Sequence, residues 1–183
     1  TFAKRQYNQV KRAIDNKVNV PFCWVGPELL TPPLMSENDF EQFCFNYDKP
    51  ICDMVHNAGS YVWVHCHGKV RKLIERYILM GVDILNPLEP PKNGDVDLNE
   101  TAKTFKGRIG LEGNIEIQDI LLESEEKLKE SIHSCVQSGK ESGRFILCPS
   151  AGFMEYPKPT QHYINNLMTY LDYGYECVNK AVY

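Results

Sequence analysis

Five short apolar runs, rich in β-branched and aromatic residues, alternate along the chain with longer stretches that have a helical period. Each run is too short for a helix and is bounded by glycine, proline or polar residues, which is typical of a buried strand. The pattern therefore predicts five strands, at residues 20–25, 61–65, 82–88, 108–111 and 144–148.

The stretches between these strands repeat apolar residues at spacings of three and four, which predicts helices that cover the sheet with one buried face. Ser36 can cap the first helix, Gly81 follows the second as a C-terminal glycine, and Pro50 should kink or break the stretch after Ser36. The expected buried faces are Phe40, Phe43, Cys44 and Tyr47; Val70, Leu73, Ile74, Tyr77 and Ile78; Leu128, Ile132, Cys135 and Val136; and Tyr163, Ile164, Leu167, Met168 and Leu171.

Strand and helix alternate five times, which predicts right-handed βαβ units and a parallel sheet. Two α/β architectures fit this order. A doubly wound, flavodoxin-like sheet would be complete at 183 residues, whereas a (β/α)8 barrel typically takes about 250 residues and would be about five-eighths present. Length favours the doubly wound sheet, but that fold expects a phosphate or cofactor loop after the first strand, where residues 26–28 offer no glycine-rich cradle.

Composition narrows the class of protein. Residues 1–183 have the size of a single domain, and 43% hydrophobic with 24% charged residues is typical of a soluble globular chain. A net charge of -4 and the lack of an apolar run of about 20 residues argue against nucleic acid and membrane partners. Seven cysteines without a CxxC pair favour a reducing, cytoplasmic location.

Polar residues gather where the predicted strands end, and in both parallel architectures the ligand site lies at the carboxyl ends of the strands. We therefore expect one polar pocket there. Its candidate catalytic residues are Glu28 after the first strand, Glu89 after the third, and Glu112 and Asn114 after the fourth.

The second strand ends in His65-Cys66-His67. Side chains alternate between the two faces of a strand, so His65 and His67 should face one point and Cys66 the opposite side. Such a pair can chelate zinc or a similar metal, with water or one of the three glutamates completing the site. Alternatively, one imidazole packs in the core, the other binds a backbone carbonyl, and there is no metal.

Lys69 and Arg71 follow at a predicted helix start, where backbone N–H groups favour anions, so a substrate carboxylate could bind there. Basic residues at such positions also serve solubility alone. With Trp24 and Ser150, which stand at the ends of the first and fifth strands, these two residues are the predicted substrate-binding set. Cys148 could act as a thiolate, although cysteine is commonly a small buried hydrophobe.

The succession WVGPE, VHCHG, GVDILNPLEPP, RIGLEGNI and FILCPSAG spans roughly residues 20–170. It resembles the carboxyl-terminal half of the uroporphyrinogen decarboxylase superfamily, which includes the cobalamin-dependent methyltransferases. Because those families are (β/α)8 TIM barrels, the resemblance implies that this chain supplies about the last five strand–helix units as a partial barrel domain. It also implies an open barrel edge, closed by a partner copy, as in a homodimer, or by an upstream part.

The resemblance also implies a position for a metal. The methyltransferases hold zinc through an HxC motif on the second of these strands and a cysteine after the last. Here His65 matches the first ligand, His67 stands at the cysteine position, and Ala151 falls about where the second cysteine is expected. The decarboxylases instead place a glycine-flanked histidine after the last strand, where residues 150–152 read Ser-Ala-Gly.

Three functions remain open. The first is a divergent methyltransferase in which a metal held by His65 and His67 acts as a Lewis acid, Glu112 and Asn114 orient a small-molecule substrate, and a corrinoid on a partner carries the methyl group. The second is metal-free decarboxylation of a tetrapyrrole, as in porphyrin biosynthesis, with cationic groups binding its carboxylates. The third is a non-catalytic module that binds a corrinoid or a partner.

Overall fold

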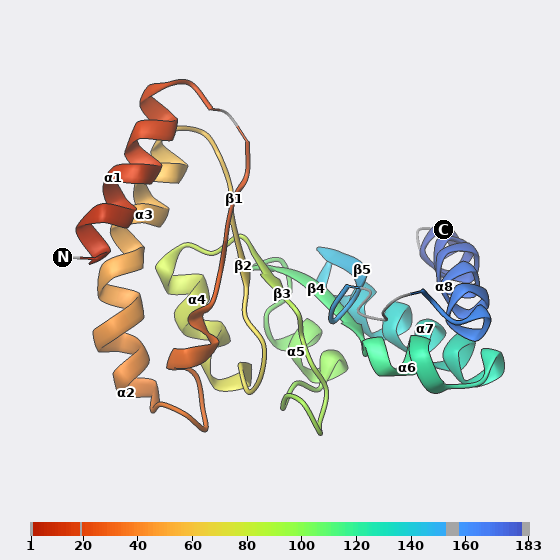
Figure 1. Cartoon of the computed structure of the whole chain (residues 1–183). Helices are drawn as coiled ribbons and strands as arrows, with labels where there is room; N and C mark the ends of the chain where they lie inside the picture. Colours follow the sequence, from red (N-terminus) through yellow and green to blue (C-terminus); the bar gives the residue numbers. More distant parts are fainter. Residues whose placement is uncertain (1, 19, 153–157, 181–183) are drawn as a thin grey trace.

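The computed structural model describes residues 2–18, 20–152 and 158–180, and within them the five strands form one parallel sheet (Figure 1). The strands occur in the sheet in chain order, and each neighbouring pair is parallel. This order is that of a barrel wall, whereas a doubly wound sheet reverses direction beside its first strand. The chain is therefore a partial (β/α)8 barrel, and the flavodoxin-like alternative is wrong. The strands are β1 (Phe22–Val25), β2 (Val62–His65), β3 (Ile84–Asn86), β4 (Gly110–Ile115) and β5 (Phe145–Pro149).

The fourth strand continues beyond its predicted end. The apolar pattern stops at Leu111, but β4 pairs with β5 from Leu111 to Ile115. Backbone pairing does not need an apolar side chain, so the strand runs on through its polar residues. Glu112 therefore lies within the sheet rather than in the following loop.

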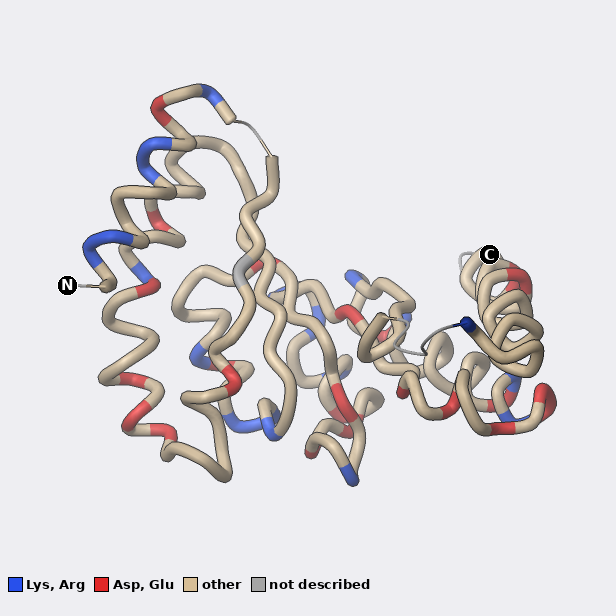
Figure 2. The backbone as a smooth tube through the Cα atoms, viewed as in Figure 1, with Lys and Arg blue, Asp and Glu red and all other residues tan. Residues whose placement is uncertain are grey.

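Helices cover one side of the sheet, with α1 packed on α3 near β1 and α8 packed on α6 and α7 near β5 (Figure 1). Lys and Arg are spread among acidic residues along these helices (Figure 2). None of the described helices has both the length and the apolar character needed to cross a membrane. The helices are α1 (Phe2–Asp15), α2 (Glu37–Phe40), α3 (Asn46–Asn57), α4 (Ile74–Met80), α5 (Leu98–Thr104), α6 (Ile117–Leu122), α7 (Glu125–Gly139) and α8 (Gln161–Lys180). Shorter helical turns are η1 (Pro27–Leu30), η2 (Glu41–Phe45), η3 (Arg71–Leu73) and η4 (Lys140–Ser142).

Two predicted buried faces are confirmed. On the turn and helix η3–α4, Val70, Leu73, Ile74 and Tyr77 have no exposed surface, and Ile78 is half-buried. On α7, Leu128, Ile132, Cys135 and Val136 are all buried. The predicted boundaries hold as well, since Ser36 forms a capping box with Asp39 and Gly81 ends α4 in the left-handed conformation. These two faces supply much of the hydrophobic core.

The first predicted face is wrong in part. Phe40 and Cys44 are buried, but Phe43 and Tyr47 are 57% and 52% exposed. The reason is that Glu41–Phe45 forms a π-helical turn, in which the periodicity departs from 3.6 residues. The predicted break at Pro50 is wrong, because α3 runs from Asn46 through the proline to Asn57.

The last predicted face is also wrong in part. Helix α8 buries Tyr163, Asn166, Tyr170, Gly174 and Cys177. A polar residue and a glycine determine which face of α8 is buried. Asn166 donates hydrogen bonds to the carbonyls of Ile120 and Glu123. Gly174 packs so closely on Leu147 that a Cβ on it would lie 2.9 Å from that side chain. A second stripe is left uncovered, and we call it the α8 outer face; it consists of Ile164, Met168, Leu171, Tyr175 and Val178.

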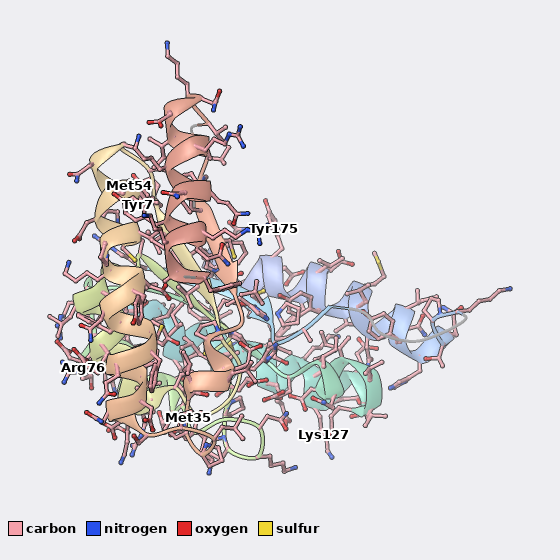
Figure 3. All side chains as sticks on the ribbon, turned by 60° about the vertical axis from the view of Figure 1, so that its left-hand side comes forward. Tyr7, Met35, Met54, Arg76, Lys127 and Tyr175 are labelled. Atoms are coloured by element: carbon pink, nitrogen blue, oxygen red, sulfur yellow. The ribbon has the colours of Figure 1, made fainter. Side chains whose placement is uncertain are left out.

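The α8 outer face adjoins the edge of the sheet. In the described part of the chain, β5 pairs only with β4, and Ile146 on β5 is 47% exposed. A cavity of about 570 Å³ lies between β5 and α8 and is lined by Ile146, Leu171, Tyr175 and Val178 among others. In Figure 3, Tyr175 projects from α8 on the side away from α7. An apolar groove therefore runs along this open edge.

Candidate functional site at the carboxyl ends of the strands

His65 and His67 face each other at the end of β2. Their Nε2 atoms lie 3.0 Å apart, and the two rings are nearly perpendicular, with centroids 4.6 Å apart. Cys66 between them is fully buried among core residues. His65 is the last residue of β2 and His67 follows two residues later, and one nitrogen of each imidazole meets at one point, as predicted.

Both imidazoles are anchored on their other side. His65 Nδ1 lies 2.6 Å from Asn86 Oδ1, and His67 Nδ1 lies 3.0 Å from Glu89 Oε1. The second oxygen of Glu89 accepts the backbone N–H of Gly68 at 2.7 Å, so both carboxylate oxygens are engaged. These contacts fix the rings so that the two Nε2 atoms point toward each other.

Asn86 is a site residue that the sequence analysis missed. It ends β3 directly beside His65 in the strand register and is 4% exposed. A single polar residue at the end of the apolar run Ile84–Asn86 was the available signal, since the other strand ends were found in this way. Parallel pairing of β2 with β3 is what brings the two side chains together.

Glu112 and Cys148 extend the site across β4 and β5. Cys148 lies near Glu112, whose charge acts on its thiol. Burial raises the pKa of the Glu112 carboxyl. Burial and the neighbouring Glu112 raise the pKa of the Cys148 thiol to about 12. Cys148 is therefore a neutral thiol at physiological pH, and the same holds for Cys66, whose pKa burial also raises to about 12.

Other predicted residues lie apart from the histidine pair. Asn114 lines a cleft of about 560 Å³ together with residues of α5 and α7, and its backbone N–H donates to Cys135 Sγ. The Ser150 hydroxyl is 3% exposed and is used within the chain, where it accepts the N–H of Ile117 and donates to Glu116. We therefore find that Ser150 ties the end of β5 to the start of α6.

The two basic residues after His67 lie among acidic side chains. Arg71 is 3.6 Å from Glu100, and its backbone N–H donates to Asp95. Lys69 lines a shallow cavity that also contains Asp39 and Asp95. These cations are thus near carboxylates of the chain itself.

The remaining predicted residues lie on or just after β1. Trp24 lies in β1 in register with Val64, and its side chain is outside the described part of the structure. Glu28 lies in η1, and its Oε2 is buried without a hydrogen-bond partner among the described residues. Glu28 is near enough to Cys66 that its charge adds to the rise in the pKa of that thiol, after burial.

The donor set fits a metal ion such as zinc. Two imidazole nitrogens face one point, and histidine ligands in metal sites usually direct their other ring nitrogen to a carbonyl or carboxylate, as His65 and His67 do toward Asn86 and Glu89. Across residues 2–18, 20–152 and 158–180, no group of three His, Cys, Asp or Glu side chains is arranged to hold a metal. A metal held by this pair would therefore keep positions open for water or substrate.

A parallel sheet in sequential order, with polar residues at the carboxyl ends of its strands, is the arrangement of a partial barrel of the TIM class, and in that class the site lies at this end of the strands. The family model for uroporphyrinogen decarboxylase (URO-D) matches residues 25–168, so the chain belongs to the uroporphyrinogen decarboxylase family. The predicted resemblance is thereby confirmed.

Comparison with solved structures agrees with this family. A methyltransferase from Methanosarcina mazei superposes with a TM-score of 0.66 and 19% sequence identity, over 94% of this chain and 47% of that one. At this identity the likeness shows the fold alone, and the chain spans about half the length of that structure. No curated protein matches the chain.

Proposed function

We propose that the chain is a divergent methyltransferase of this family, in which zinc held by His65 and His67 assists transfer of a methyl group between a small molecule and a corrinoid carried by a partner. The observation that carries the proposal is the pair of Nε2 atoms facing each other at the barrel mouth, each ring anchored through Nδ1. The methyltransferase with the same fold supports it.

Methyl transfer to a heteroatom needs an acceptor with a free lone pair. The acceptor's lone pair forms the new bond to the methyl carbon, the bond between that carbon and the donor atom breaks with its electron pair left on the donor, and the acceptor's proton leaves. Bound zinc would act as a Lewis acid that lowers the pKa of the acceptor. His65 and His67 would hold the metal, and their anchored rings would keep its position constant.

Glu112 is the group we propose to orient the substrate. It is 7% exposed and follows Leu111, which pairs with Leu85 of β3, the residue before Asn86. Because burial raises its pKa, Glu112 favours holding a proton more than an exposed glutamate does. Asn114 lines a different cleft, so we keep only Glu112 in this role.

Tetrapyrrole decarboxylation finds less support at this site. Binding of acetate and propionate groups calls for cationic side chains directed into the mouth. The charged residues around the histidine pair are instead the buried Glu89 and Glu112, and the nearby Arg71 is paired with Glu100. The charge of the described site therefore favours a bound cation over a polycarboxylate.

A cytoplasmic location is part of this proposal. All seven cysteines are free thiols, which is expected in a reducing compartment. Five of them are buried, where they act as small core residues.

The proposal is tested with the purified chain, zinc and methylcobalamin as the corrinoid probe. A panel of small thiols and amines is offered as acceptors, loss of the methyl–cobalt absorbance is followed, and the methylated product is identified by mass spectrometry. We expect zinc-dependent transfer that is lost in His65→Ala and kept in His133→Ala, since His133 is an exposed histidine on α7. Zinc binding without transfer to any acceptor would contradict the proposed function.

A further inference from the structure

A chain of side-chain hydrogen bonds joins the ends of β2 and β3 to the loop after β3. It runs from Glu89 through His67 and His65 to Asn86. One end is the carboxylate of Glu89 and the other is the amide oxygen of Asn86, and both groups accept hydrogen bonds and cannot donate them. The hydrogen on the facing nitrogen of each histidine is assigned from this fact.

At the first end, the carboxylate of Glu89 accepts from two donors. Its Oε2 takes the backbone N–H of Gly68, and its Oε1 lies 3.0 Å from His67 Nδ1. His67 Nδ1 must therefore carry the hydrogen. In a neutral imidazole this leaves Nε2 of His67 with a lone pair.

At the other end, the side-chain oxygen Oδ1 of Asn86 is turned toward His65 Nδ1. Asn86 Oδ1 can only accept, so His65 Nδ1 carries the hydrogen at 2.6 Å. Nε2 of His65 is left with a lone pair as well.

Two nitrogen lone pairs thus face each other at 3.0 Å in the middle of the chain. This contact is repulsive for two neutral rings and becomes favourable when both nitrogens bind one cation. We propose that Asn86 and Glu89 are positioning residues that fix both histidines as the Nδ1–H tautomer, so that their Nε2 atoms are prepared to bind a single metal cation. The inference rests on the proposed function for the identity of that cation as zinc.

The inference changes the role expected of Glu89 and gives one to Asn86. Glu89 was predicted as a catalytic residue or a metal ligand, but both of its oxygens are engaged with His67 and Gly68, and it is 6% exposed. Its contribution therefore acts through His67. Asn86 acts in the same way through His65.

The decisive measurement needs no substitution. In ¹⁵N-histidine-labelled, metal-free chain at pH 8, where an ordinary imidazole is neutral, two-bond ¹⁵N–¹H correlations report the tautomer of each ring. We expect His65 and His67 both to show protonated Nδ1 and unprotonated Nε2. A protonated Nε2 in both rings, or a majority Nε2–H form in either one, would overturn the inference.

Two substitutions then test the positioning role. Asn86→Leu and Glu89→Leu remove the acceptor for one ring each, so that ring should shift toward a mixture of tautomers and the affinity for zinc, measured by calorimetry, should fall about 10–100-fold. Glu89→Gln keeps an acceptor oxygen and should restore the His67 tautomer and much of the affinity. Asn99→Leu, at an exposed asparagine on α5, is the matched control and should change neither.

The outcomes separate the two proposals. Unchanged tautomers and unchanged zinc affinity in both leucine variants would overturn the positioning role, even if the parent transfers methyl groups. The predicted tautomers with their predicted shifts would support it, even if methylcobalamin is not consumed, and only the proposed function would then fail.

Discussion

The Nε2 atoms of His65 and His67 lie 3.0 Å apart, although the two residues are separated by a buried cysteine at the end of a strand. The strand alternation places both rings on one side, and the anchors from β3 and the following loop turn them toward each other. The pair is thus built by three segments of chain. Its arrangement is the basis for the first prediction.

Removal of either imidazole should abolish tight zinc binding. His65→Ala or His67→Ala leaves one histidine ligand, which is too few to compensate for dehydration of the ion. We expect about one zinc per parent chain by elemental analysis after incubation and gel filtration, and less than about a tenth of that in either variant. Occupancy should also fall at acidic pH, because protons compete with the metal for the imidazole nitrogens.

The control for this experiment is Cys66→Ser, together with the exposed His133→Ala. Cys66 points away from the pair, so its substitution should leave occupancy unchanged. Sub-stoichiometric zinc in the parent, or equal occupancy in parent and both histidine variants, would return the pair to a structural role.

The buried carboxyl of Glu112 predicts a dependence of stability on pH. Burial raises its pKa in the folded chain, so between the unfolded value of about 4.3 and the folded value the native state binds more protons than the unfolded state. Stability from this group is therefore present below that window and is lost as pH rises through it. The side chain introduced by Glu112→Gln cannot ionise, so this variant does not lose stability as the pH rises through the window.

Urea unfolding of parent and Glu112→Gln at pH 4 and pH 7 tests this dependence. The free energy of unfolding of the variant, relative to that of the parent, should increase as the pH rises. Glu130→Gln replaces an exposed glutamate on α7, and its free energy of unfolding relative to the parent should not change with pH. A difference between parent and Glu112→Gln that stays constant with pH would mean that the carboxyl is not destabilised by burial.

The packing of α7 against β5 predicts that Gly139 cannot be enlarged. A Cβ at this position would overlap the ring of Phe145. Alanine favours a helix by about 1 kcal/mol over glycine, but overpacking a tight contact costs about 1–3 kcal/mol. Gly139→Ala should therefore fail to stabilise the chain and lower its melting temperature, whereas Ser138→Ala next to it should not. A higher melting temperature in Gly139→Ala would show that the contact relaxes freely.

Much of the fold could be predicted because strand and helix signals in this chain are local. Five apolar runs and two helix faces were found from periodicity, and the order of the strands followed from the family resemblance. The faces of η2 and α8 were missed in part, since a π-helical turn and the packing of Asn166 and Gly174 override a 3.6-residue period. Neither effect is visible in a count of apolar residues.

The site could be predicted only where its residues are close in the sequence. His65 and His67 are two positions apart at the end of β2, so the alternation of an extended chain predicts that they lie on the same side. Asn86 joins them through strand pairing, which the sequence does not specify residue by residue. Asn114 and Ser150 were expected in the same pocket because they also end strands, but the structure directs them to another cleft and to the start of α6.

The last prediction concerns the α8 outer face and the edge of β5. Leu171 and Tyr175 are 51% and 74% exposed beside Ile146, and an edge strand flanked by apolar side chains favours pairing with another chain. We expect the 183-residue chain to self-associate at high concentration in light scattering, with Leu171→Glu and Tyr175→Lys shifting it toward monomer. Asp172→Lys, at an exposed polar position between them, should leave the association unchanged. A stable, monodisperse monomer of the parent at high concentration would show that this apolar groove does not drive association.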